Sequence, residues 1–370
     1  MKSRASCGIC SWVATYEIGL WLAVLFLAGC GGSSNGTNAT NGSNGGGNSP
    51  APSQLAVWTN TNFGVPFTMV GTDPSIAGAG TTNIPALIIP VNFNFSAVGV
   101  VMSPESVSCG DSATALSRTQ NSPLFNSAPW SDGPISLGTT QFGDAFQRAN
   151  FWNLVSTGSP EYHVILQPIT VLPAISVDVP VGIGAVLGPS PTCPIQPFGG
   201  VPISFMDTVV ANTISSQHIT ANTVPIFLSY DMQYFPPTGG TFLGYHNVQG
   251  PQTYIVASYI DSGYAGLPGV SASDVTVLSH EIGEWMDDPM VNNLVSPGWG
   301  GFGIQTACSS VLEVGDPLTF SNFSVVTPDF TYHFQELAYF SWFGRNSPSL
   351  AVNGRYSMLG TFGAFAPPCP

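Results

Sequence analysis

The pattern of apolar and polar residues along the chain predicts both strands and helices. Runs rich in β-branched and aromatic residues predict strands at residues 86–95, 98–102, 162–166, 224–230 and 253–260. Helix-like patterns occur at residues 112–120, 142–152 and 201–214. The expected fold is therefore α+β with a mixed β-sheet, in which the strand at 253–260 comes just before a further helix.

Clear start and stop signals bound that further helix. The Ser-Ala-Ser-Asp segment at residues 271–274 has the pattern of a capping box, and Pro289 supplies the stop. At 3.6 residues per turn, the apolar residues fall on one side, while His280 and the carboxylates fall together on the other. We therefore expect a two-faced helix with its apolar side toward the core.

His280, Glu281 and Glu284 form the most informative pattern in this helix. Residues i and i+4 share a helix face, so His280 and Glu284 can offer two ligands to one Zn²⁺ ion. Glu281 follows the histidine directly, as the general base does in the H-E-x-x-H zinc peptidases, and Glu284 stands where their second histidine usually is. The pattern predicts a metal site with Glu281 as the catalytic residue.

An ordinary amphipathic helix with its acidic face in water is the alternative, and composition argues against it. Only 7% of the chain is charged, against about 25% in typical soluble domains. Residues 281–288 nevertheless carry four acids. Charge is thus concentrated beside a histidine, which favours the metal site.

A zinc site needs at least three protein ligands, so one more has to come from outside the helix. Glu313 is the first candidate, 29 residues after Glu284. A lone histidine is more often a hydrogen-bonded core or surface residue than a ligand. The residues that could replace or support these ligands are Asp288, Asp316, His246 and His333.

The N-terminal residues predict export and a tether. An apolar run at residues 18–28 follows Lys2 and Arg4, and it is short for a membrane span but typical of a signal peptide. The Leu-Ala-Gly-Cys sequence at 27–30 resembles a bacterial lipobox. That resemblance implies a signal peptide over residues 1–30 and lipidation of Cys30, with an ordinary signal peptide as the alternative.

The rest of the chain divides into a linker and a folded part. Residues 31–54 are rich in Gly, Ser and Asn and predict a flexible linker. Residues 55–370 are long enough for one large domain or two lobes, and the Pro- and Gly-rich segment 187–200 is the candidate lobe boundary. We expect the protein in the bacterial cell envelope, held to the membrane by its lipid anchor alone.

Four cysteines remain after removal of the signal peptide and lipidation of Cys30. None has the C-x-x-C spacing of a zinc ribbon, so disulfides in an oxidising compartment are the preferred interpretation. Four cysteines allow three connectivities. Order along the chain suggests pairing Cys308 with Cys369 and Cys109 with Cys193.

Charge excludes some classes of partner. From residue 31 onward the chain has no lysine, four arginines and 19 acids, a net charge of −15. It offers phosphates no basic patch, so nucleic acid and anionic lipid surfaces are not expected partners. The sequence does not indicate an oligomeric state.

Residues 278–289, followed by Asn292-Asn293 and by the Glu-Val-Gly-Asp segment at 313–316, resemble a pattern in secreted zincin-like proteins. The same region is similar to part of the plant EXORDIUM (phosphate-induced) proteins, and the similarity extends over roughly residues 245–360. The resemblance implies a zincin-type active-site helix, with His280, Glu284 and Glu313 as ligands and Glu281 as base. The plant relatives are growth-associated wall proteins, so kinship does not fix an activity.

Two functions follow from these patterns. The first is a lipid-anchored extracytoplasmic zinc metallohydrolase, an endopeptidase that holds one Zn²⁺ ion and cleaves a peptide or protein substrate. The second is a non-catalytic envelope protein in which a structural metal site supports the binding of glycan or protein. A fourth protein ligand would close the site, whereas an open position would allow catalysis.

Overall fold

The computed structural model describes residues 54–61, 66–189, 197–264, 272–303, 305, 307–319 and 321–369. The predicted signal peptide with Cys30, the linker up to residue 53, Cys193 and residues 190–196 of the proposed lobe boundary lie outside this part. Within it, no helix is both long and apolar enough to cross a membrane.

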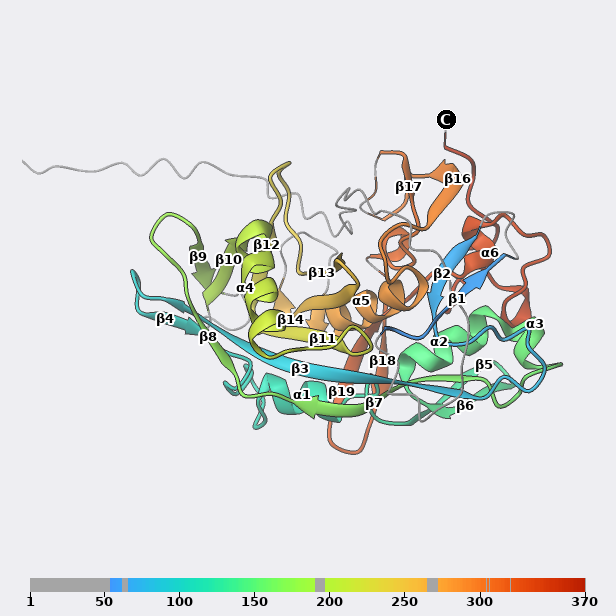
Figure 1. Cartoon of the computed structure of the whole chain (residues 1–370), viewed down its shortest axis with the longest axis horizontal. Helices are drawn as coiled ribbons and strands as arrows, with labels where there is room; N and C mark the ends of the chain where they lie inside the picture. The colour runs from blue at the N-terminus through green and yellow to red at the C-terminus, as the bar shows by residue number, and fades with distance from the viewer. Residues whose placement is uncertain are drawn as a thin grey trace, which may run out of the picture.

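Strands outnumber helices in this fold (Figure 1). The strands are β1 (Val57–Asn60), β2 (Phe67–Val70), β3 (Thr81–Phe95), β4 (Val100–Met102), β5 (Ala128–Asp132), β6 (Ile135–Thr140), β7 (His163–Val171), β8 (Ile175–Asp178), β9 (Ala185–Pro189), β10 (Pro197–Pro202), β11 (Val224–Tyr230), β12 (Met232–Phe235), β13 (Gly244–Gln249), β14 (Gln252–Tyr264), β15 (Ala272–Asp274), β16 (Leu294–Trp299), β17 (Ser309–Val311), β18 (Asn322–Val326) and β19 (Thr331–Gln335). The helices are α1 (Ala115–Asn121), α2 (Phe142–Asn150), α3 (Trp152–Val155), α4 (Ile203–Ser216), α5 (Thr276–Asp287), α6 (Phe340–Phe343) and the 3₁₀ turns η1 (Asp316–Leu318) and η2 (Val352–Gly354).

A mixed sheet forms the centre of the molecule and confirms the predicted α+β class. Its strands run in the order β13-β14-β11-β3, and β7, β8 and β4 also pair with the long strand β3. The strands β3, β7, β8, β11 and β14 are parallel, whereas β13 and β4 are antiparallel to their neighbours. All five predicted strands and the three predicted helices are present, and all but the strand at 224–230 have shifted ends.

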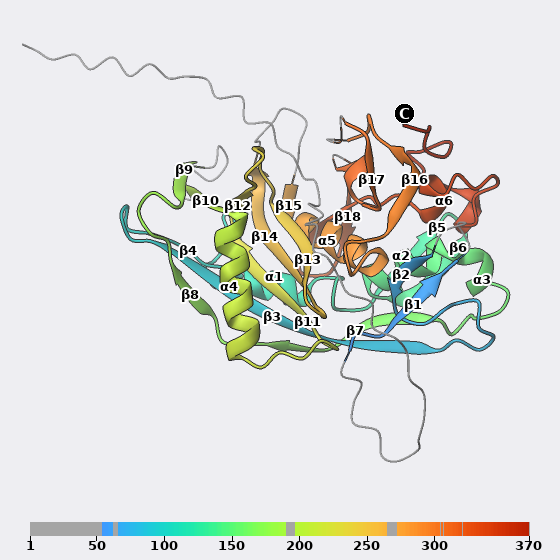
Figure 2. The same ribbon diagram turned by 45° about the horizontal axis from the view of Figure 1, so that its top comes forward.

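The sheet separates two hydrophobic clusters because alternate side chains of each strand point to opposite faces. In β3, Ile88 belongs to the larger cluster and Ile89 to the smaller one. The larger cluster includes residues of α2 and α5, and the smaller includes Met206 and Val210 of α4. Figure 2 shows α5 between α4 and α2 along the molecule.

One expectation about α5 was wrong. Residues 272–274 are not a capping box but strand β15, which pairs with β14, and the N-cap residue Val275 makes no side-chain capping bond. All twelve residues of the helix are buried, so the alternative of an acidic face in water does not hold. It packs against β13 and β14 as well as α2, β2 and β19, so its polar side is also enclosed. The stop before Pro289 is confirmed, since the helix ends at Asp287.

The disulfide prediction is confirmed in one of its two pairs. Cys308 and Cys369 are bonded and join the segment before β17 to the C-terminal residues. The proposed Cys109–Cys193 pair stays a prediction, because Cys193 lies outside the described residues.

Candidate metal centre

Helix α5 brings His280 and Glu284 together as the one-turn spacing requires. The Nε2 atom of His280 lies 3.1 Å from Oε2 of Glu284. Both side chains are enclosed, with 3% of His280 and none of Glu284 exposed. Glu281 lies beside them and is 2% exposed. The helix therefore presents an imidazole and two carboxylates to the interior.

Strand β13 adds a second histidine to this region. Its neighbour Tyr245 points to the α4 side of the sheet, where it donates a hydrogen bond to Asp207 at 2.9 Å. Alternation then turns His246 toward α5. Its Nδ1 atom lies 3.5 Å from Oε2 of Glu281 and 3.7 Å from Oε2 of Glu284.

The close approach of β13 to α5 depends on Gly244. A Cβ atom at this position would lie 2.6 Å from a methyl carbon of Val277 and 2.9 Å from a carboxylate oxygen of Glu281. Any side chain would push the strand away from the helix. A glycine two residues before His246 thus allows the histidine to reach the carboxylates.

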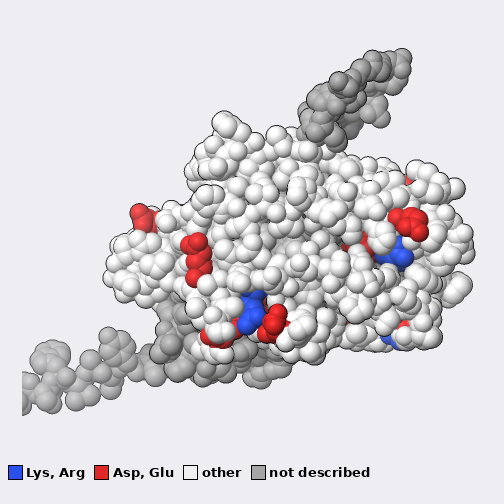
Figure 3. Space-filling view, turned by 90° about the horizontal axis from the view of Figure 1, so that it is seen from below, with Lys and Arg blue, Asp and Glu red and all other residues white. Residues whose placement is uncertain are grey.

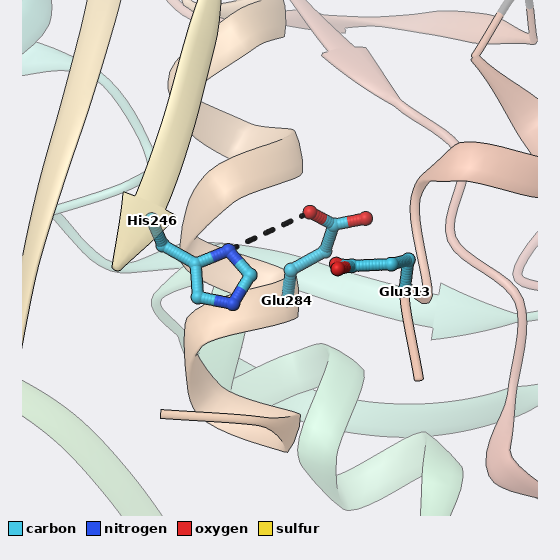
Figure 4. A group of neighbouring side chains, drawn as sticks. All are labelled: His246, Glu284 and Glu313. Carbon is cyan, nitrogen blue, oxygen red and sulfur yellow. Dashed lines mark ion pairs between the residues drawn. The ribbon is translucent and has the colours of Figure 1, made fainter. Parts of the chain in front are cut away.

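Glu313 enters from the segment between β17 and η1. Its flanking residues Leu312 and Val314 are fully buried, and their backbones are bonded to Asn293 at 3.0 Å and Ala338 at 2.8 Å. Glu313 is 2% exposed, and neither of its carboxylate oxygens makes a hydrogen bond. Figure 4 shows His246, Glu284 and Glu313 converging from three different segments.

Asp316 approaches the same place from η1. Its Oδ1 atom lies 3.6 Å from Nε2 of His280. We name the complete set the His/Glu cluster: His246, His280, Glu281, Glu284, Glu313 and Asp316.

Gly315 and Gln335 hold His280 and Glu284 in place. The Gly315 amide donates to Oε1 of Glu284 at 3.1 Å, and its carbonyl accepts from the Gln335 side chain at 2.6 Å. The Gln335 side-chain oxygen lies 3.0 Å from Nδ1 of His280. An amide oxygen only accepts hydrogen bonds, so Nδ1 carries the proton and Nε2 is left to face the cluster.

The absence of a side chain at Gly315 is required by this arrangement. A Cβ atom there would lie 2.5 Å from Nδ1 of His280, closer than real contacts allow. The backbone of Gly315 has ordinary right-handed helical angles, so the glycine serves close packing and not a special conformation.

Among the described residues, two groups of three bring their ligand atoms within 4.8 Å of one another. One is His246, Glu284 and Glu313, and the other is His280, Glu281 and Glu284. The expected trio of His280, Glu284 and Glu313 is therefore divided between them, with Glu284 common to both.

Two of the alternative candidates are used elsewhere. His333, on β19, lies 2.6 Å from a carboxylate oxygen of Asp274 and is a partly exposed residue outside the cluster. Asp288 accepts hydrogen bonds from the backbone amides of Asn292 and Asn293 at 2.9 and 3.1 Å. It stabilises the turn after α5, next to the cluster.

Carboxylates outnumber cationic groups in the cluster. Four carboxylates face two imidazoles, and every one of these side chains is at most 3% exposed. The four arginines among the described residues bond to Asp111, to Asp132 or to backbone carbonyls. Buried carboxylates without counter-charges are costly, so the cluster requires protons or a cation.

This excess of negative charge changes the acidity of the cluster. Burial alone would lower the pKa of His280, but the carboxylates of Glu284, Glu281 and Asp316 outweigh it and raise the pKa to about 10. Burial also raises the pKa of Glu313 well above its usual value, and Glu284 and Asp316 add to the rise. Without a metal, the cluster therefore retains protons.

The donor set fits zinc. Two imidazole nitrogens and several carboxylate oxygens are ligands that Zn²⁺ takes in proteins. Both ring nitrogens of His246 and both oxygens of Glu313 lack hydrogen-bond partners. A bound cation would satisfy these atoms, which packing alone leaves unsatisfied.

The sequence patterns only partly indicated this arrangement. They named His246 as an alternative ligand, but they did not predict strand β13, which carries it. Gln335 lies within the region of the resemblance, but no role was predicted for it. The available signals were two glycines, since Gly244 and Gly315 each stand within two residues of a cluster member.

Comparison with protein-family models, curated proteins and solved structures gives no match. The resemblance to zincin-like and EXORDIUM proteins therefore stays a prediction.

Proposed function

We propose that this protein is a lipid-anchored envelope metallohydrolase that uses zinc and cleaves peptide bonds. What supports the proposal is the convergence of two histidines and four carboxylates, from three separate segments, in a buried cluster without arginine or lysine. Such a donor set without counter-charges is typical of a metal site. The lipid anchor at Cys30 and the peptide substrate rest on the sequence patterns.

In this proposal His280, Glu284 and Glu313 hold the ion. A bound zinc ion would polarise the scissile carbonyl and make a water molecule more acidic. Glu281 accepts the proton of the attacking water and returns it to the leaving amine. Burial raises the pKa of Glu281, against the opposing effect of His246, which makes its carboxylate a stronger base. Gln335 keeps Nε2 of His280 directed toward the ion.

A non-catalytic metal site is the second candidate, and two observations favour it. His246 offers a nitrogen beyond the three expected ligands, and a fourth ligand closes a zinc site. None of the cluster side chains is more than 3% exposed. In this case the ion stabilises the packing of α5 against β13 and the segment that carries Glu313.

Glu281→Gln separates the two candidates. The amide has nearly the same shape but cannot accept a proton, so the hydrolase keeps its metal and loses peptide cleavage. Metal content and cleavage of a broad peptide library are measured for the wild type, Glu281→Gln and Glu284→Gln, and Glu284→Gln is expected to lose metal as well. Wild-type protein that binds zinc and cleaves no peptide supports the structural site instead. Metal loss in Glu281→Gln contradicts the role given to Glu281.

A further inference from the structure

The two ligand groups in the His/Glu cluster have Glu284 in common. Protein ligands bind zinc at about 2.0–2.2 Å, so two atoms on one ion lie at most about 4.4 Å apart. His280 meets this limit with Glu284 at 3.1 Å and Asp316 at 3.6 Å. His246 meets it with Glu284 at 3.7 Å.

Among the described residues, neither group of three ligand atoms within 4.8 Å contains both histidines. The ligand atoms of His246, Glu284 and Glu313 form one compact group, and those of His280, Glu281 and Glu284 form another. The two groups share Glu284, and both histidines lie near the same oxygen of its carboxylate, Oε2, while Oε1 accepts a hydrogen bond from the Gly315 amide. One carboxylate between two sets of ligands is the arrangement of a bridged pair of ions.

The charge of the cluster also favours two ions. Glu281, Glu284, Glu313 and Asp316 carry four negative charges when ionised, and both histidines are neutral when they act as ligands. One divalent ion leaves two negative charges in a site that is at most 3% exposed. Two divalent ions balance all four, and no arginine among the described residues is there to do so.

Atoms without hydrogen-bond partners belong to the group that does not contain His280. Both ring nitrogens of His246, which is 1% exposed, lack hydrogen-bond partners, and so do both oxygens of Glu313. Figure 4 shows these two side chains pointing toward Glu284. Together with Glu284, they form a second set of ligands.

We propose that the cluster is a dinuclear metal site bridged by Glu284. One divalent ion is held by His280 and Glu284 together with Asp316, which lies 3.6 Å from His280 and takes the place that Glu281 leaves as base. The other is held by His246, Glu284 and Glu313. Glu281 lies beside both and keeps its role as base. The proposal rests on the proposed metal-binding function, extends it from one ion to two and moves Glu313 from the ion at His280 to the second ion. In hydrolases, two ions stabilise both the attacking and the leaving atoms.

Metal stoichiometry tests the proposal on the unmodified protein. The purified full-length protein is stripped with a chelator, reloaded with Zn²⁺ or Co²⁺, and freed of loosely bound ions. We expect two equivalents of either metal. Two Co²⁺ ions about 3.5–4 Å apart are also expected to show magnetic coupling in electron paramagnetic resonance.

One equivalent of metal overturns the dinuclear site and leaves the mononuclear function standing, whereas no bound metal overturns both. Two equivalents without magnetic coupling would mean that the second ion binds elsewhere, and this result also overturns the dinuclear site.

Variants assign each ion to its ligands. His246→Ala and Glu313→Gln are each expected to bind one equivalent without coupling, and His280→Ala is expected to do the same. His218→Asn, at an exposed histidine outside the cluster, is the control and keeps two coupled ions. Two coupled ions in folded His246→Ala contradict the proposal. Where a variant does not fold, the metal stoichiometry and magnetic coupling of the wild type still decide whether the site is dinuclear.

Discussion

Two acidic regions flank helix α5, and they differ in how their carboxylates are satisfied. The His/Glu cluster has four carboxylates around two imidazoles, and several of its atoms make no hydrogen bond. The second region, which we name the Asp274 cluster, lines a cavity at the start of α5. It comprises Asp111, Asp261 and Asp274 with their partners Arg118, Tyr230 and His333.

Every carboxylate of the Asp274 cluster has protein partners. Asp111 forms two hydrogen bonds with Arg118, at 2.6 and 2.5 Å. Asp274 pairs with the ring and the backbone amide of His333 at 2.6 and 2.9 Å. Asp261 accepts from a backbone amide and from a tyrosine hydroxyl. This region is complete without a ligand.

The comparison shows that acidity alone does not identify a site. Figure 3 shows a face with few charged residues, on which the arginine atoms lie beside acidic atoms. Paired carboxylates of this kind stabilise the fold locally. Buried carboxylates and imidazoles that the protein leaves without partners indicate a missing cation. Predictions that contrast the two regions test this distinction.

The largest contrast is expected between Glu284→Gln and Asp274→Asn. Glu284 belongs to both ligand groups, so its loss should lower zinc affinity by more than about 100-fold, beyond the usual effect of residues that only support a ligand. Asp274→Asn changes a group with protein partners and should leave zinc affinity unchanged. Competition with a zinc chelator measures both. Equal zinc affinity in the two variants contradicts the distinction.

Gln335→Leu removes the acceptor that orients His280. We expect zinc affinity to fall by about 10–100-fold, the range found for groups that orient a ligand. Gln335→Glu keeps an acceptor facing Nδ1 but loses the donor to the Gly315 carbonyl, so it should restore part of the affinity, which a merely structural role does not predict. The chelator assay applies again, and failure of Gln335→Glu to rescue would count against the orienting role.

Gly315→Ala inserts a methyl group against the ring of His280. Overpacking of this kind costs about 1–3 kcal/mol, and displacement of the ring should also weaken zinc binding. Gly80→Ala is the matched control, because a Cβ atom there meets nothing within 4 Å. Denaturant unfolding and zinc affinity are compared for the two variants. Equal stability would show that the ring can move aside at no cost.

The smallest effect is expected from Asp111→Asn in the Asp274 cluster. The hydrogen bonds of Arg118 lower the pKa of Asp111 to about 2, so its contribution to stability is present above the unfolded pKa of about 3.9 and is lost as pH falls through 2. Solvent screening limits this contribution to about 1 kcal/mol. Unfolding at pH 6 and pH 2 measures it. A difference between variant and wild type that is larger at pH 2 contradicts the assignment.

The sequence predicted the central strands and α5 because their patterns are local. β11 was predicted with its observed bounds, since a strand buried on both faces is a continuous apolar run. β13 was missed because Gly, His, Asn and Gln break any alternation in it. The burial of both sides of α5 was also missed, because the covering segments are distant in sequence.

The site was predictable only where its residues share a helix. His280, Glu281 and Glu284 follow from the spacing of one turn. The approach of His246 depends on strand pairing, and the contact of Gln335 with His280 spans 55 residues. Neither of these contacts between distant segments can be predicted from a single sequence. The division of the ligands into two groups therefore required the structure.

Thermal unfolding of the metal-stripped protein with added zinc tests the central claim most directly, namely that the His/Glu cluster binds a divalent cation. Binding to the folded state alone adds about 2.7 kcal/mol of stability when free zinc is one hundred times its Kd. We predict that zinc raises the unfolding temperature of the wild type and leaves that of Glu284→Gln nearly unchanged. A wild type whose unfolding temperature does not respond to zinc or to other divalent ions would contradict the account.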